Sequence, residues 1–154
     1  VGHDYRSYSA SVKQALVTGL LAGGAEVHDI GLALSPMAYF AQFALDVPCV
    51  AMVTASHNDN GWTGIKMGMN RPLTFGPDEM IALKEIVLEA KFEAPGGGRY
   101  IYVPNLPERY IAEMTKRPKF KRRLKVVCAC GNRFVRLSVS RLIGSFAGEA
   151  VRLL

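Results

Sequence analysis

The segment from Thr54 to Lys66 carries the side chains whose types and spacing most clearly point to chemistry. Thr54-Ala55-Ser56-His57-Asn58 directly follows the apolar run at residues 50–53, and Lys66 stands ten residues after Ser56. A serine hydroxyl can hold a phosphoryl group as an ester, which divides a difficult transfer into two steps. Phosphoryl transfer also needs cations and N–H donors around the phosphoryl oxygens. A hydroxyl, an imidazole, an amide and an ammonium on one segment therefore favour phosphoryl chemistry.

Alternating strand and helix patterns surround this segment and must position it. Extended segments are predicted at residues 1–5, 25–30, 49–53, 65–68 and 101–103, and helices at residues 9–22, 35–45, 77–90 and 107–115. The alternation predicts an α/β fold, a three-layer α/β/α domain with a mixed, mostly parallel sheet that is truncated at both ends. Ligands of such sheets bind at the carboxyl ends of strands, and Ser56 follows one such end.

The helix patterns also predict caps and buried faces. We expect Ser9 to cap the first helix, because a serine hydroxyl can accept a hydrogen bond from a free N–H group of the first turn. Apolar spacing predicts that the first helix turns inward Val12, Ala15, Leu16 and Leu20. In the helix at 107–115 the side chains expected to face inward are Tyr110, Ile111 and Met114.

Several motifs of the chain resemble those of the α-D-phosphohexomutases, the family of phosphoglucomutase and phosphomannomutase. The family's signature is Thr-Ala-Ser-His-Asn followed by a variant of Asn-Gly-x-x-x-x-Lys, which residues 54–58 and 60–66 match. Residues 2–6 resemble its Gly-Arg-Asp-x-Arg motif, with a histidine where the first arginine is usual. Ser35-Pro36 matches its Ser-Pro or Thr-Pro pair, and residues 124–132 resemble the first strand of its second domain. The resemblance covers residues 1 to about 132.

The resemblance implies a reaction in which phosphate moves between the 1- and 6-positions of a hexose. Ser56 would be the phosphoryl carrier, Lys66 a cation for the phosphoryl oxygens or a base, and His57 a supporting group for the serine. Residues that would organise the site or contact the substrate are Asp4, Arg6, Asn58, Asn60 and Gly61. For Asp4 and Arg6, an ion pair that holds the loop and a direct substrate contact are equal alternatives.

The resemblance also implies cofactors and a substrate for the intact enzyme. Mg²⁺ would bind one oxygen of the phosphorylated Ser56 and three aspartates of the second domain, and glucose 1,6-bisphosphate would be the activator. Only the phosphate oxygen would come from this chain, and Mg²⁺ needs near-octahedral oxygen coordination. We therefore expect no cofactor to bind tightly here. The partner of the intact enzyme would be a hexose phosphate.

Other family motifs have no counterpart in the chain. The acidic metal loop, the sugar-recognition loop and the phosphate-binding C-terminal domain are missing from the sequence, and likeness fades after Asn132. We therefore expect a fragment: a phosphoserine domain at 1–115, a basic connector at 116–123 and the incomplete start of a second α/β domain at 124–154. Such a fragment should have negligible mutase activity, and its preference between glucose and mannose stays open.

The sequence leaves two other functions to consider. The formal net charge is +6, and seven basic residues lie between positions 116 and 125. Such a run can bind polyanions, but the sequence has no recognised nucleic-acid motif, so we favour a solvated connector and do not expect nucleic acid as a partner. A serine hydrolase using Ser56 and His57 is disfavoured, because adjacent residues rarely form the required hydrogen bond and no orienting acid is evident.

The remaining features concern the setting of the chain. The longest apolar stretch is too short for a membrane span, and we expect no membrane partner. An odd number of cysteines, Cys49, Cys128 and Cys130, argues for reduced thiols and a cytoplasmic location. Core surface left uncovered by missing parts is expected to favour self-association.

Overall fold

A computed structural model describes residues 1–71, 74–116, 126–130, 135, 138–141, 143–144 and 151–153. Its contacts divide the chain into two units, Val1–Pro104 and Asn105–Leu154. The first unit contains β1 (Gly2–His3), α1 (Ser9–Ala22), β2 (Glu26–Asp29), β3 (Gly31–Leu32), α2 (Ser35–Ala44), β4 (Val50–Val53), β5 (Ile65–Gly68), α3 (Pro77–Glu89) and β6 (Arg99–Tyr102). The domain limits expected from the sequence stay a prediction.

The second unit contains α4 (Leu106–Thr115) and the parallel pair β7 (Val126–Cys128) and β8 (Val151–Leu153). Met114 was expected to face inward on α4 but is 39% exposed, whereas Leu106 in the first turn is fully buried. The basic run expected to form the connector falls almost wholly at residues 117–125, outside the described residues.

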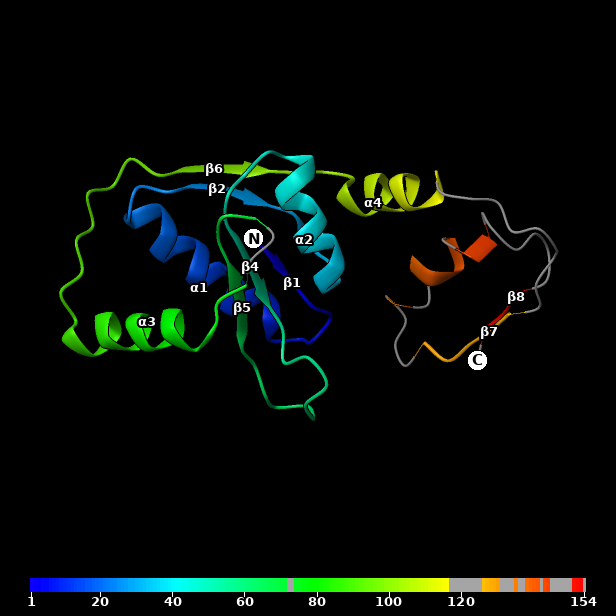
Figure 1. Ribbon diagram of the computed structural model, residues 1–154, viewed down its shortest axis with the longest axis horizontal. Coiled ribbons are helices and arrows are strands. Elements are labelled where there is room, and N and C mark those ends of the chain that lie inside the picture. The colour runs from blue at the N-terminus through cyan, green and yellow to red at the C-terminus, as the bar shows by residue number, and fades with distance from the viewer. Residues whose placement is uncertain are drawn as a thin grey trace. The chain divides into compact units, whose positions relative to one another are not determined.

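The main sheet of the first unit has the order β3-β1-β4-β5 (Figure 1). β1 pairs in parallel with both β3 and β4, while β5 returns antiparallel to β4 with Val53 opposite Ile65. A second sheet pairs β2 with β6 in parallel. The predicted α/β fold with a mixed, mostly parallel sheet is confirmed.

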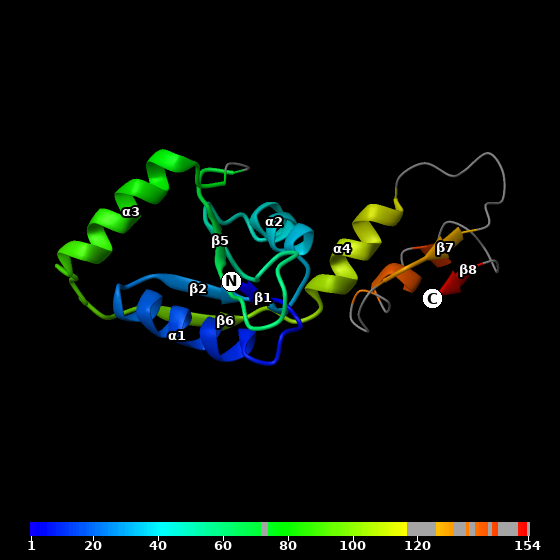
Figure 2. The same ribbon diagram turned by 90° about the horizontal axis from the view of Figure 1, so that it is seen from below.

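Helices cover both faces of the main sheet. The chain moves from β1 to β3 in one direction along the sheet and from β3 across to β4 in the other. Because parallel crossovers are right-handed, these two connections place α1 and α2 on opposite faces, as Figure 2 shows. The core between the layers includes Val17 of α1, Met37 and Ala38 of α2, and Met52 and Val53 of β4.

Two details of the helices differ from the sequence prediction. Ser9 is the first residue of α1 and not its cap, and its hydroxyl donates to Asp4 Oδ1 at 2.5 Å. Ala15 was expected to face inward but is exposed, because Val17 takes the fully buried position of α1. Ser9 therefore acts on the end of β1 and not on the N–H groups of its own helix.

A buried ion pair joins α1 to the sheets. Asp29, at the end of β2, is 2% exposed and pairs with Lys13 of α1. Its carboxylate also accepts hydrogen bonds from the Tyr100 hydroxyl at 2.7 Å and the Gly31 N–H at 2.8 Å. Burial by itself raises the pKa of Asp29, but the hydrogen bonds from Lys13, Tyr100 and Gly31 outweigh it and hold the pKa below its ordinary value.

Lys13→Ala should therefore destabilise the chain, because it leaves a buried carboxylate without its cation. We expect a loss of about 3 kcal/mol in the free energy of unfolding, measured by urea denaturation followed by circular dichroism. The matched control is Lys84→Ala on the exposed surface of α3, which should change stability by no more than about 0.5 kcal/mol. Equal losses in the two variants would contradict a stabilising role for the pair.

Candidate functional site

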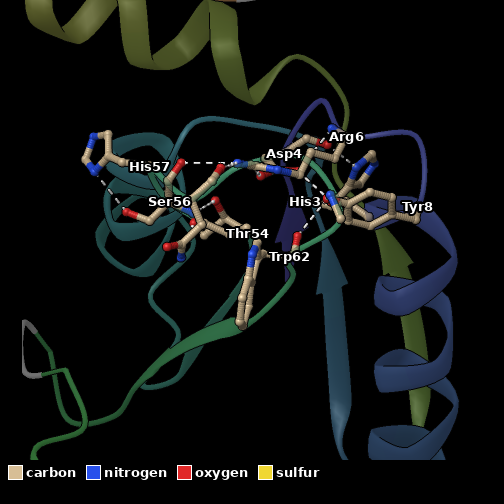
Figure 3. A network of polar contacts seen from close by, with 12 residues as sticks. His3, Asp4, Arg6, Tyr8, Thr54, Ser56, His57 and Trp62 are labelled. Atoms are coloured by element: carbon tan, nitrogen blue, oxygen red, sulfur yellow. Dashed lines mark hydrogen bonds and ion pairs between the residues drawn. The ribbon is translucent and has the colours of Figure 1, made fainter.

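The candidate site lies where the carboxyl ends of β1 and β4 meet. The backbone N–H of Asp4, just after β1, donates to the carbonyl of Val53 at 2.9 Å. The N–H of Thr54 donates to the carbonyl of Gly64, also at 2.9 Å, and so closes the loop between β4 and β5. We call residues 54–64 the serine loop. Figure 3 shows this loop beside the segment that follows β1.

Ser56 is presented to solvent by an unusual backbone conformation. Thr54 and Ala55 before it are buried, whereas Ser56 is exposed and has a φ of 56°. A residue with a side chain rarely adopts this left-handed conformation, which costs on the order of 1–3 kcal/mol and requires support from its surroundings. Its own N–H donates to Thr54 Oγ1 at 3.0 Å.

Two further hydrogen bonds close a turn around Ser56. The Asn58 side-chain amide donates to the carbonyl of Ala55 at 2.9 Å, and the Asn58 N–H donates to the same carbonyl at 3.0 Å. These bonds hold the backbone of the turn on both sides of Ser56. Its hydroxyl stays exposed at the end of the strand.

Arg6 ties the serine loop to the end of β1. Its guanidinium forms an ion pair with Asp4 and donates to the carbonyl of Asn58 at 2.8 Å and to that of Ser56 at 3.4 Å. The side chains of Arg6 and Asp4 are only 20% and 15% exposed. Figure 3 shows Arg6 between Asp4 and the two loop carbonyls. Arg6 therefore holds the backbone of the loop, and its donors are directed at protein groups.

Asp4 is the acceptor on which these contacts converge. Its carboxylate accepts from the Ser9 hydroxyl, from the Arg6 backbone N–H at 3.1 Å and from the Arg6 guanidinium. Burial raises the pKa of Asp4, but hydrogen bonds from Ser9, the Arg6 backbone, Thr54 and the Arg6 side chain outweigh it. The pKa therefore lies below its ordinary value, and Asp4 is a carboxylate at neutral pH.

His57 is a titratable group within hydrogen-bond distance of the serine hydroxyl. Its Nδ1 lies 3.2 Å from Ser56 Oγ, and both side chains are exposed. One of the two atoms can donate to the other, so His57 can accept or return the hydroxyl proton. In the described part of the chain, no carboxylate forms a hydrogen bond with His57, so the arrangement lacks the orienting acid of a hydrolase triad.

Lys66 lies at the same end of the sheet as the serine loop. It stands opposite Met52 on β5, two residues after the carbonyl of Gly64 that closes the loop. Its side chain is exposed, and across the described residues it forms no ion pair or hydrogen bond. Its role as cation or base stays a prediction. Asn60 is likewise exposed.

The structure shows contacts of two residues to which the sequence gave no individual role, Thr54 and Tyr8. Thr54 accepts from the Ser56 N–H through its side chain. The Tyr8 hydroxyl accepts from the Gly61 N–H at 3.0 Å and donates to the carbonyl of Trp62 at 2.7 Å. Thr54 was visible as part of the motif, but nothing in the sequence linked Tyr8 to residues more than fifty positions away.

Comparison with known proteins assigns the chain to a family. Residues 1–94 match the sequence model described as phosphoglucomutase/phosphomannomutase, alpha/beta/alpha domain I. The chain belongs to this family. The resemblance seen in the motifs around Asp4 and Ser56 is therefore confirmed.

Individual relatives of this phosphohexomutase domain agree. A probable phosphoglucosamine mutase of Pyrococcus abyssi is 34% identical over 134 residues, which cover 86% of this chain and 30% of that protein. A phosphomannomutase/phosphoglucomutase of Pseudomonas aeruginosa is 29% identical over 153 residues, covering 99% of this chain and 32% of its own length. The chain thus spans about a third of the length of the relatives it matches.

A solved structure shares the fold. The crystal structure of a phosphoglucomutase/phosphomannomutase family protein from Burkholderia thailandensis superposes with a TM-score of 0.82 at 26% identity. The match covers 99% of this chain and 34% of that one. The comparisons give no support to the alternative of a module that binds polyanions through residues 116–125.

The described residues do not fit a complete magnesium site. They contain no group of three or more His, Cys, Asp or Glu side chains that could hold a metal ion. A phosphorylated Ser56 would add one oxygen ligand, which falls short of the coordination that Mg²⁺ requires.

None of the helices in the described segments is long and apolar enough to cross a membrane.

The low pKa values of Asp4 and Asp29 predict acid sensitivity. Each folded-state pKa lies below that of the unfolded chain, so the unfolded state takes up protons first as the pH falls. Their stabilisation should be complete above about pH 4, the unfolded value for aspartate, and should be lost as the pH falls through the folded values. Urea unfolding from about pH 6 down to about pH 3 measures this loss.

Asp4→Asn is the control for the pH profile, because it keeps the shape of the side chain and removes its charge. It should flatten part of the acid slope and leave the part that comes from Asp29. A wild-type stability that does not change across this range would contradict the depressed pKa values.

Proposed function

We propose that this chain is the phosphoserine domain of a hexose-phosphate mutase, with Ser56 as the group that carries the phosphoryl unit. The observation that carries the proposal is the exposed Ser56 hydroxyl, held in a left-handed turn at the carboxyl end of β4. Family membership supports the class of reaction, an isomerisation by phosphate transfer. The activity belongs to a longer protein than this chain.

The proposed step forms a serine phosphate ester. Ser56 Oγ attacks a phosphorus of a hexose bisphosphate, the bond between that phosphorus and the sugar oxygen breaks, and a hexose monophosphate leaves. The hydroxyl proton passes to a base, and the sugar oxygen gains a proton. His57 Nδ1 at 3.2 Å is one candidate for that base, and the amine of Lys66 is the other. In the transfer that completes the isomerisation, the hydroxyl at the other position of a hexose monophosphate attacks the phosphorus on Ser56, the bond between that phosphorus and Ser56 Oγ breaks, and the serine oxygen regains a proton.

Electrostatics at the loop suit this step. In the described structure Arg6 uses its donors on Asp4 and on loop carbonyls, so it fixes the loop and leaves the phosphoryl oxygens to other groups. Lys66 has no protein partner among the described residues and is free to meet an anion. Fixing the nucleophile in advance lowers the barrier because less freedom is lost during the reaction.

The substrate class is a hexose phosphate, and the names of the relatives suggest glucosamine, glucose and mannose phosphates as candidates. Because catalysis here depends on positioning and charge, a chain with about a third of its relatives' length should show negligible turnover.

Three free cysteines agree with a cytoplasmic setting. The exposed apolar residues of α3, which include Ile81, Ile86 and Leu88, are the surface on which self-association would depend.

Intact-mass measurement tests the proposal. After prolonged incubation with glucose 1,6-bisphosphate, the chain should gain the mass of one phosphoryl group. Ser56→Ala should lose this gain completely, because the acceptor oxygen is removed. Ser7→Ala is the matched control, since Ser7 is an exposed serine near the site with no assigned role, and it should keep the gain.

Peptide mapping of the phosphorylated chain locates the modified residue. A mass gain that persists in Ser56→Ala, or that maps to another residue, would refute the assignment. Absence of any gain in the wild-type chain would refute the proposal for this domain.

A further inference from the structure

The hydroxyl of Tyr8 connects the start of α1 to the far half of the serine loop. It accepts from the N–H of Gly61 at 3.0 Å and donates to the carbonyl of Trp62 at 2.7 Å. One oxygen thus bonds backbone groups of two successive residues, which lie more than fifty positions away in the sequence. A phenylalanine ring in the same place would keep the packing and lose both bonds.

These bonds act where the loop has little other support. Gly61 has a φ of 100°, and residues 56–63 are exposed, with Trp62 at 65%. We call residues 59–63 the tip of the serine loop. Among the described contacts, the only other hydrogen bond of the tip backbone is a long one, from the Trp62 N–H to the carbonyl of Asp59 at 3.4 Å. Tyr8 is the residue before α1 and is half-buried. Its aromatic side chain has few rotamers, so holding it in one orientation costs little conformational entropy.

The two halves of the loop are therefore held from one short segment. Arg6 holds the carbonyls of Ser56 and Asn58, and Tyr8, two residues later, holds Gly61 and Trp62 (Figure 3). We propose that Tyr8 is a positioning residue that fixes the tip of the serine loop and, through it, the orientation of Ser56. The effect on Ser56 rests on the proposed function, whereas the effect on the loop does not.

Trp62 provides a direct report on the tip, because it is the only tryptophan of the chain. Tyr8→Phe should lower the fluorescence anisotropy of Trp62 and increase its quenching by acrylamide. The rate of Ser56 phosphorylation by glucose 1,6-bisphosphate should fall about two- to tenfold, the size of one ordinary hydrogen bond, because the two lost bonds act on Ser56 only through the loop. Tyr102→Phe on β6 is the matched control, since Tyr102 is 61% exposed, and it should change neither quantity.

The outcomes separate this inference from the proposed function. Loosening of Trp62 in Tyr8→Phe supports the positioning role even when the wild-type chain takes up no phosphate, a result that would refute only the mutase proposal. A folded Tyr8→Phe chain with unchanged Trp62 anisotropy and quenching would overturn the inference, as would slower phosphorylation without loosening.

Amide exchange in the wild-type chain decides the matter if Tyr8→Phe does not fold. After correction for intrinsic exchange rates, the N–H of Gly61 should exchange more slowly than that of Asn60, an exposed neighbour for which the described structure gives no backbone donor bond. Equal protection of the two amides would show that the Tyr8 bond does not form in solution.

Discussion

The ion pair between Arg6 and Asp4 is the interaction on which the candidate site depends. Ser56 has to leave a buried strand, turn into a left-handed conformation and present its hydroxyl to solvent, and each of these demands opposes stable packing. The guanidinium of Arg6 bonds the carbonyls of Ser56 and Asn58, and Asp4 keeps that guanidinium in place. Charge-assisted hydrogen bonds of this kind are stronger than neutral ones, which makes them suited to offset a strained backbone.

The fold brings these groups together through the order of its strands. β1 and β4 are parallel neighbours, so the residues that follow them, Asp4 and Thr54, emerge at the same edge of the sheet. Because α1 begins only a few residues after β1, the segment with Arg6 and Tyr8 remains beside the serine loop. The buried Lys13–Asp29 pair anchors the same helix to β2, so the support of the loop is itself fixed to the core.

Much of the fold could be predicted from the sequence, because apolar periodicity and turn residues report local structure directly. The strand predicted at 49–53, the returning strand at 65–68 and the loop serine between them follow from that pattern. The contacts of Ser9 and Tyr8 do not, because they depend on which strands become neighbours. Ser9 is a typical capping residue by type, yet its hydroxyl bonds Asp4 because the end of β1 lies within reach. Likewise α3 carries Met80, Leu83, Ile86 and Val87 at helical spacing, a pattern from which a buried apolar face is expected, but none of its residues is buried.

In the proposed reaction, Arg6 holds the serine loop in the form that accepts a phosphoryl group. The most direct test is the rate at which glucose 1,6-bisphosphate phosphorylates Ser56 in Arg6→Ala, with the site confirmed by peptide mapping. Loss of a charged hydrogen-bond donor should slow the reaction about tenfold or more, whereas Arg99→Ala, which removes only an exposed ion pair with Glu26, should react at the wild-type rate. Phosphorylation of a folded Arg6→Ala chain at the wild-type rate would contradict the account.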